Sequence, residues 1–174
     1  DANGLRILAD AVDELIICSS CSKNFGLYRE RIGACSIIAK DSTSADISNS
    51  VMLSVVRSIY SMPPAHGADI VNTILSSTEL TQLWHDELDE MRTRINGLRS
   101  LIKNSLAEKG VAQDFSFIDQ QNGMFSFLGI NKAQIDRLQK DYAIYIVGSS
   151  RVNVAGVSQT NIDYFSNAIA DVLK

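Results

Sequence analysis

The longest run of helix-spaced apolar residues lies between Ser77 and Gly110, and it limits how the chain can fold. The S-T-E-L sequence at Ser77–Leu80 is typical of a helix start, and Gly110 is a suitable stop. At about 1.5 Å per residue such a helix extends about 45 Å, long enough to leave one domain and enter another. We therefore place a domain crossing within it. Its apolar positions are Leu80, Leu83, Trp84, Leu88, Met91, Ile95, Leu98, Ile102 and Leu106.

Short apolar runs alternate with helical patterns before this long helix. The run at Glu14–Cys18 predicts a strand buried on both faces, and a second buried strand is predicted at Ala34–Ala39. The polar stretch Asp41–Ala45 is suited to capping the next helix, and the prolines at 63–64 must end that helix because residues before proline disfavour the α region. A shorter helix is predicted from His66 to Leu75.

The sequence after Gly110 predicts a compact unit of strands and helices. In chain order the pattern is strand, helix, strand, strand and helix, at Met124–Leu128, Lys132–Asp141, Ala143–Val147, Arg151–Ala155 and Asn161–Leu173. The fold class predicted for the whole chain is therefore α/β.

Composition excludes several classes of function. The net charge is −4 and Lys and Arg are scattered, which argues against nucleic-acid binding by phosphate neutralisation. No apolar run approaches the roughly 20 residues of a membrane span, so no membrane partner is expected. The three cysteines include a C-x-x-C at Cys18 and Cys21 but no second pair to complete a zinc site, so we expect no metal. A reducing, cytoplasmic location is expected.

A single lysine stands among hydroxyl residues just after the first predicted strand. Lys23 follows Ser20 and Ser22, and Arg31 comes a short distance later. Ligands bind at strand ends in open α/β sheets, and a neighbouring cation such as Arg31 would make the lysine a better nucleophile toward a carbonyl. Two hydroxyls and a guanidinium also suit a phosphate. A solvated lysine in a Ser-rich turn is the alternative interpretation.

Four stretches, in order, resemble one enzyme family. They are S-K-N-F-G-L-Y-R-E-R-I-G at Ser22–Gly33, Y-S-M-P-P-A-H-G-A at Tyr60–Ala68, N-G-M-F-S-F at Asn122–Phe127 and R-V-N-V-A-G at Arg151–Gly156. Together they are similar to class I, fold type I aminotransferases that use pyridoxal 5'-phosphate, namely the aspartate and aromatic amino acid enzymes. The resemblance covers only the C-terminal half of such an enzyme.

The resemblance implies a domain organisation. Residues 1–89 would be the C-terminal part of the large cofactor-binding domain, with its mostly parallel sheet. Residues 90–174 would be the small C-terminal α/β domain, and the long helix would join the two. The chain opens at Asp1 without methionine, so we expect it to be a piece of a longer protein.

The resemblance also assigns roles around the cofactor. Lys23 would bind pyridoxal phosphate covalently and move the substrate proton as the catalytic base and acid. Ser20, Ser22 and Arg31 would hold the cofactor phosphate. Cys21 stands where many relatives carry tyrosine, a change that we expect to be tolerated.

Three residues match substrate-binding positions of the family. Arg151 would receive the substrate α-carboxylate through a two-pronged ion pair, with a plain surface arginine as the alternative. Phe125 would pack near the bound substrate, or it is simply part of the core. Arg57 would reach the partner subunit's site in a homodimer and bind a side-chain carboxylate, which supports dicarboxylic substrates without excluding aromatic ones. Met62 replaces an expected asparagine or serine and leaves the side-chain pocket less defined.

The expected activity is transfer of an amino group between an L-amino acid and a 2-oxo acid such as 2-oxoglutarate. The family's aspartate at the pyridinium nitrogen and its ring-stacking aromatic residue precede the lysine by more than the residues before Lys23. We therefore expect this chain alone to be inactive. The alternatives are another fold type I enzyme, which Arg57 argues against, and a catalytically inactive folded fragment.

Overall fold

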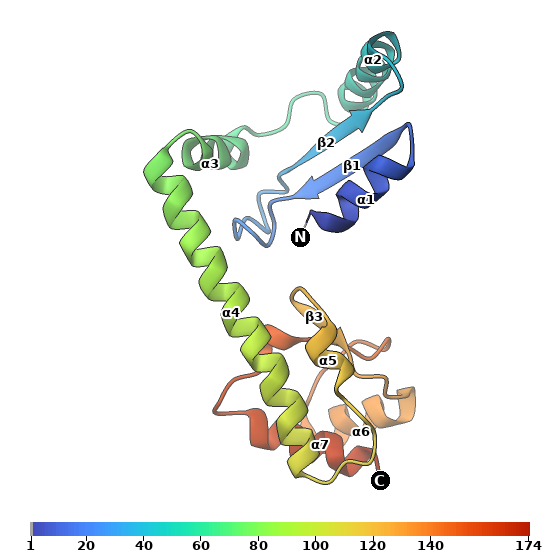
Figure 1. Ribbon diagram of the computed structural model, residues 1–174, viewed down its shortest axis with the longest axis vertical. Coiled ribbons are helices and arrows are strands. Elements are labelled where there is room, and N and C mark those ends of the chain that lie inside the picture. Colours follow the sequence, from blue (N-terminus) through green and yellow to red (C-terminus); the bar gives the residue numbers. More distant parts are fainter. Residues whose placement is uncertain (1) are drawn as a thin grey trace. The chain divides into compact units, whose positions relative to one another are not determined.

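The computed structural model describes residues 2–174 and forms two compact units (Figure 1). The first unit ends at His85 and the second begins at Asp86. The division falls within α4 (Thr78–Glu108), the long helix predicted from its apolar repeat. The sequence analysis expected a domain boundary between residues 89 and 90, and that assignment of domains stays a prediction. Asp1, from which we expected an upstream continuation, lies outside the described residues.

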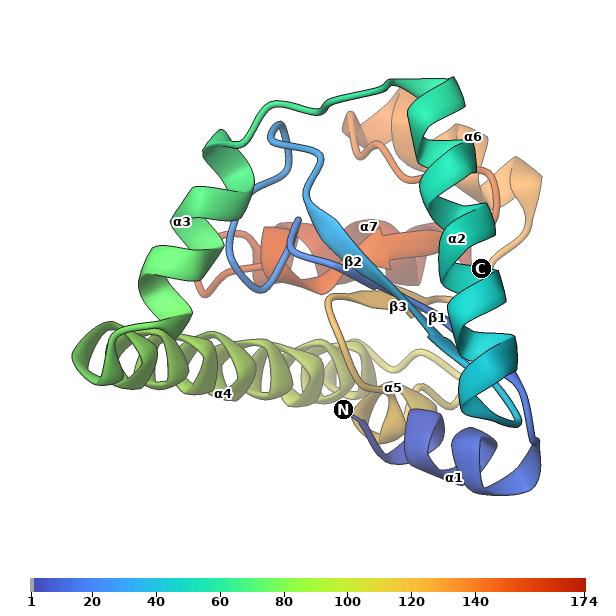
Figure 2. The same ribbon diagram turned by 90° about the horizontal axis from the view of Figure 1, so that it is seen from above.

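The first unit combines helices with a two-stranded antiparallel sheet. Strands β1 and β2 run side by side, and α2 lies beside β2 (Figures 1 and 2). Before α4, the elements are α1 (Asn3–Ala11), β1 (Leu15–Ser20), β2 (Gly33–Ile38), α2 (Ser42–Ile59) and α3 (His66–Leu75).

The sequence predicted a mostly parallel sheet. Residues 2–174 instead form two strand pairs that are both antiparallel. The link between β1 and β2 contains turns and no helix. Parallel neighbours need a long crossover, usually through a helix, whereas a chain that simply turns back pairs antiparallel.

Local signals in the first unit act as the sequence predicted. The side chain of Asp41 caps α2 by accepting a hydrogen bond of 2.7 Å from the backbone N–H of Ser44. Helix α2 ends at Ile59, before the two prolines, and α3 has the predicted bounds. Capping chemistry and proline geometry depend on near neighbours, so these boundaries could be found without knowledge of the tertiary fold.

Burial differs strongly between the units. Among residues 2–85 only Ser22 and Gly67 are buried, and Ile16 of β1 is 67% exposed. The predictions that the first strand is buried on both faces and that the second strand is buried are therefore wrong for this structure. Covering both faces requires a layer of helices on each side of the sheet. Residues 2–85 do not supply that cover.

The second unit has its own hydrophobic core, which lies between α4, α6 and α7 and the strand pair β3–β4. Ile102 and Leu106 of α4 and Ile169 of α7 are fully buried in it. After α4, the elements are α5 (Phe117–Gln120), β3 (Phe125–Phe127), α6 (Lys132–Tyr142), β4 (Arg151–Asn153), the 3-10 turn η1 (Val154–Gly156) and α7 (Ile162–Val172).

The predicted strand at Ala143–Val147 is absent, although the alternation that suggested it is real. Ile144 and Ile146 pack against the core, whereas Tyr145 is 75% exposed and Val147 is 47% exposed. The segment thus buries part of its apolar surface by packing against the core, without pairing to another strand. The four-residue helix α5 was not predicted, because one turn carries too little periodicity to identify. Within residues 2–174, no helix combines the length and apolarity needed to span a membrane.

The exposed apolar surface of the first unit should make the chain self-associate. Ile47 and Val51 lie one turn apart on α2 and are 61% and 58% exposed. We expect the double variant Ile47→Glu, Val51→Glu to raise the concentration needed for association by about tenfold or more, because apolar burial drives it. Sedimentation velocity over a dilution series measures this. The matched control is Tyr145→Glu in the second unit, and equal effects of both variants would contradict the assignment to the first unit.

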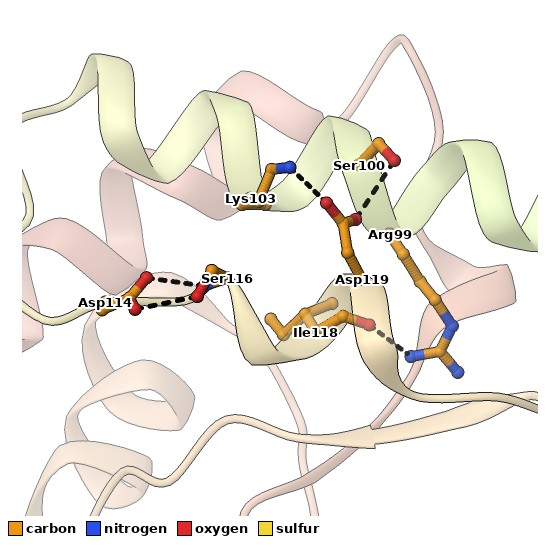
Figure 3. Close-up of polar contacts among 7 residues, drawn as sticks. All are labelled: Arg99, Ser100, Lys103, Asp114, Ser116, Ile118 and Asp119. Carbon is orange, nitrogen blue, oxygen red and sulfur yellow. Dashed lines mark hydrogen bonds and ion pairs between the residues drawn. The ribbon is translucent and has the colours of Figure 1, made fainter.

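An ion pair between α4 and α5 should give the second unit an acid-sensitive contribution to stability (Figure 3). Hydrogen bonding from Lys103 holds the pKa of Asp119 below its ordinary value. The stabilisation is therefore complete above about pH 3.9, the unfolded value, and is lost as pH falls through the lower folded value. We expect Asp119→Asn to cost about 0.5 to 1 kcal/mol at pH 7 and to weaken the loss of stability between pH 5 and pH 2.5.

Urea unfolding across this pH range provides the measurement. The control is Asp136→Asn, which removes a carboxylate from the exposed pair with Lys132. If Asp119→Asn keeps the full pH dependence of the unmodified chain, the assignment to Asp119 is wrong.

Candidate functional site

The predicted cofactor residues Ser20, Ser22, Lys23 and Arg31 lie on one hairpin, at the turn end of β1 and β2. The register pairs Ser20 with Gly33 and continues through a 3.0 Å hydrogen bond from Cys21 N–H to the Ile32 carbonyl. Ser22 and Arg31 come next on each side, in the segment that connects the two strands. The structure therefore brings the hydroxyls and the arginine to the same end of the sheet, as the sequence predicted.

The two serines form a compact pair of hydroxyl groups. The Ser20 Oγ donates to the Ser22 Oγ at 3.0 Å and also accepts from the Ser22 backbone N–H at 3.2 Å. Ser22 is one of the buried residues of this unit, whereas Lys23 beside it is exposed. This arrangement fixes two oxygens at the strand end, and the Ser22 hydroxyl still has its proton to donate to an anion.

Arg31 takes a backbone conformation that side chains rarely adopt. Its φ is +54°, and its guanidinium donates a 2.7 Å hydrogen bond to the Tyr28 carbonyl. A left-handed residue in a turn redirects the chain sharply, and here it precedes the start of β2. The turn thus carries a cationic group at the same end of the sheet as the serine pair, which favours binding of a phosphate.

The side chain of Lys23 lies over an aromatic ring. Its Nζ is 4.8 Å from the centre of the Tyr28 ring, within the range of a cation–π interaction. The Lys23 carbonyl accepts a 3.2 Å hydrogen bond from Gly26, which closes the turn. Sequence reasoning did not find the Tyr28 contact, because only the folded turn brings the two side chains together.

The start of α4 holds this lysine turn. Trp84 stacks on Phe25 with ring centres 4.5 Å apart, and its Nε1–H donates a 2.7 Å hydrogen bond to the Asn24 carbonyl. Because Asn24 directly follows Lys23, this contact restrains the backbone next to the candidate catalytic residue. The sequence marked Trp84 only as an apolar position of the long helix, so this role was missed.

Helix α3 approaches the same turn closely at Gly67. A side-chain carbon at Gly67 would come within 2.8 Å of the Glu30 Cβ and 3.3 Å of the Ile32 Cβ. A larger residue would therefore push the turn away from the helix. The requirement for glycine in the Y-S-M-P-P-A-H-G-A stretch is explained by this contact with the segment that carries Arg31.

Arg57 occupies the last turn of α2 and is exposed. Within the described residues of the first unit, no hydrogen bond or ion pair joins it to the residues of the lysine turn. The structure therefore leaves its guanidinium available to a ligand outside this unit. Its predicted role depends on a partner subunit and stays a prediction.

Arg151 and Phe125 form a second cluster, in the second unit. They lie on the paired strands β4 and β3, where Arg151 is directly opposite Phe127. The Arg151 guanidinium stacks 4.7 Å from the centre of the Phe125 ring, and Phe125 is 37% exposed. The sequence allowed two interpretations of Phe125, packing near the substrate or membership of the hydrophobic core. Its exposure excludes the second. Stacking uses the face of a guanidinium, whereas carboxylates bind at its N–H edges.

The two antiparallel strand pairs thus position two clusters suited to anions, and comparison with known proteins gives the class of protein. The family model for aminotransferase class I and II matches residues 1–169. The chain therefore belongs to this aminotransferase family.

Two individual relatives show which enzymes of the family the chain resembles. The chain is 51% identical over 173 residues to an aspartate aminotransferase of Escherichia coli, covering 99% of this chain and 44% of that protein. It is 41% identical to an aromatic-amino-acid aminotransferase of Pseudomonas aeruginosa, covering 99% of this chain and 43% of the relative.

A solved structure is similar throughout the chain. It is an aromatic-amino-acid aminotransferase from Burkholderia pseudomallei, covalently bound to pyridoxal phosphate, with a TM-score of 0.93 and 44% sequence identity. The match covers 99% of this chain and 43% of that structure. The chain thus spans less than half the length of these relatives.

Proposed function

We propose that this chain is the C-terminal part of a pyridoxal phosphate-dependent aspartate or aromatic amino acid aminotransferase. Residues 1–89 would complete the large cofactor-binding domain, α4 would join the domains, and residues 90–174 would form the small domain. The observation that carries the proposal is the lysine turn, where Lys23 follows the hydrogen-bonded pair Ser20 and Ser22, and Arg31 lies at the same end of the β1–β2 pair. High identity to both aspartate and aromatic enzymes supports it.

The residues present fit the cofactor. Ser20 and Ser22 present hydroxyls 3.0 Å apart at the strand end, and Arg31 adds a positive charge at the same end of the β1–β2 pair, so together they would hold the phosphate. Lys23 is the adjacent primary amine and would hold the cofactor aldehyde covalently. When bound, pyridoxal phosphate supplies an electron-withdrawing ring that stabilises negative charge at the substrate Cα.

The roles of the chain's own residues follow from their chemistry. The Lys23 amine would accept the proton from the substrate Cα and return it at the neighbouring cofactor carbon. The Arg151 fork would bind the α-carboxylate and fix the direction of the Cα–H bond, with Phe125 against its face. Both roles require a charged or basic group at one defined position, which the β1–β2 hairpin and the β3–β4 strand pair would provide.

The proposed substrates are an L-amino acid and a 2-oxo acid, with aspartate or glutamate and 2-oxoglutarate as the dicarboxylic pair. The exposed Arg57 would bind the side-chain carboxylate in the partner subunit's site of a homodimer. Aromatic amino acids are also proposed as substrates, because both an aspartate aminotransferase and an aromatic-amino-acid aminotransferase match the chain at high identity. The free thiols of Cys18 and Cys35 support a reducing, cytoplasmic location.

We further propose that turnover requires the part of the relatives' length that this chain does not span. The groups that hold the pyridinium nitrogen and stack on the ring in this family would lie there. The experiments below therefore use the full-length enzyme that contains this chain.

The covalent role of Lys23 can be tested by trapping. We expect Lys23→Ala to abolish cofactor trapping by borohydride, because no other amine would be next to the bound aldehyde. Mass spectrometry of the reduced protein gives the yield. Lys40→Ala is the matched control and should trap as the unmodified enzyme does. Undiminished trapping in Lys23→Ala would refute the proposal.

The role of Arg57 predicts a change in substrate preference. Loss of a charge-assisted pair in a closed site costs about 2 to 5 kcal/mol, or about 30-fold to several thousand-fold in kcat/KM. We expect Arg57→Ala to lose this much with aspartate and much less with phenylalanine. Steady-state kinetics with both substrates measures the ratio, and Arg6→Ala on α1 serves as the control. Equal losses with the two substrates would show that Arg57 does not bind the distal carboxylate.

A further inference from the structure

Strand β3 has one paired edge and one edge without a neighbouring strand. Flanking hydrogen bonds of 3.0 Å show which groups face β4, namely those from Leu128 N to the Ser150 carbonyl and from Val154 N to the Met124 carbonyl. Because backbone groups alternate along a strand, the carbonyls of Gly123 and Phe125 point away from β4. These carbonyls therefore take their donors from another part of the unit, or from water.

Arg99 of α4 supplies those donors. Its Nη2 donates to the carbonyls of Gly123 at 2.5 Å and Phe125 at 3.0 Å, and its Nη1 donates to the Ser126 hydroxyl. Nη1 also reaches the Ile118 carbonyl of α5 at 3.4 Å, the contact drawn in Figure 3. One side chain therefore occupies the outer edge of β3 as a neighbouring strand would, and it ties this edge to α4 and α5.

The burial of Arg99 shows that its place is set by these contacts. The residue is 1% exposed, and desolvation lowers the pKa of its guanidinium, with the charge of Asp119 opposing the shift. None of its four hydrogen-bond acceptors is a carboxylate. A buried cation with only neutral acceptors is costly unless its geometry is well satisfied. Packing alone would be served better by an apolar side chain.

The residues that Arg99 holds also contact the proposed substrate-binding cluster of Phe125 and Arg151. Arg99 binds the carbonyl of Phe125, and the ring of the same Phe125 stacks on Arg151. We propose that Arg99 is a positioning residue that fixes the edge of β3 and thereby holds Phe125 against Arg151, which presents that guanidinium to the substrate carboxylate. The link to substrate rests on the function proposed above for Arg151.

A lysine could not replace Arg99 in this role. The planar fork of arginine donates in fixed directions and here reaches carbonyls two residues apart, Gly123 and Phe125. A lysine amine is a single point at the end of a flexible chain. Arg99→Lys keeps the charge and much of the length, so it separates the geometry of the fork from the presence of a cation.

Hydrogen exchange measured by mass spectrometry on the 174-residue chain tests the proposal without cofactor or substrate. We expect Arg99→Met and Arg99→Lys to speed amide exchange in peptides covering 123–128 and 150–154 by about tenfold or more, because buried acceptors lose their donors. Peptides of α6 and α7 should change less than about twofold. The matched control is Lys103→Met, which removes a cation from α4 that contacts Asp119 and not β3.

A second readout reports on Arg151 directly. Labelling of arginine by phenylglyoxal, followed by peptide mapping, should be faster at Arg151 in both Arg99 variants, because the Phe125 ring no longer covers its face. Uniformly faster exchange throughout the second unit would mean that Arg99 only stabilises the fold, and would overturn the proposal. Unchanged exchange and labelling, or the same local effect in Lys103→Met, would also overturn it.

If Arg99→Met does not fold, Ser126→Ala provides the same test with a smaller perturbation. It removes one acceptor of Arg99 and should speed exchange in the same two peptides only. Neither readout depends on transamination. A negative result here would therefore leave the Lys23 assignment standing, and failure of cofactor trapping at Lys23 would leave the positioning role of Arg99 standing.

Discussion

Antiparallel register is the constraint on which both candidate clusters depend. In the first unit, the β1–β2 register pairs Ser20 with Gly33 and keeps Ser22, Lys23 and Arg31 in the segment that connects the strands. In the second unit, the β3–β4 register sets Phe125 close enough to stack on Arg151. A slip of one residue in either pair would turn alternate side chains to the opposite face. The chemistry proposed for each cluster would then lose its geometry.

Each register is secured by residues outside the strands, and the two units do this differently. Trp84 of α4 and the close approach at Gly67 of α3 restrain the lysine turn in a unit that buries very little. Arg99 secures β3 from within a unit that has a closed hydrophobic core. The second unit therefore has the features of an independently stable body, whereas the first depends on contacts that its own described residues do not make.

Features governed by near neighbours were predictable from the sequence. The Asp41 cap, the bounds of α3 and the extent of α4 all follow from capping chemistry and apolar spacing. The lysine turn was found because its residues are close in sequence and resemble a family motif. Membership in that family is confirmed by the match over residues 1–169, whereas the role of each residue stays a prediction.

Features that depend on distant partners were missed or wrong. An apolar run does not show whether a strand pairs parallel or antiparallel, or whether helices cover it, so the expected buried parallel sheet was wrong for β1 and β2. The alternation at Ala143–Val147 predicted a strand, but its isoleucines pack without pairing. Arg99 was not identified from the sequence, because its burial depends on contacts of α4 with β3 and α5.

The most direct test of the account is an experimental structure of the full-length enzyme with pyridoxal phosphate bound. The account predicts the cofactor attached to Lys23, with its phosphate within hydrogen-bonding distance of Ser20, Ser22 and Arg31. A cofactor attached to another lysine, or a phosphate held away from the end of the β1–β2 hairpin, would contradict it.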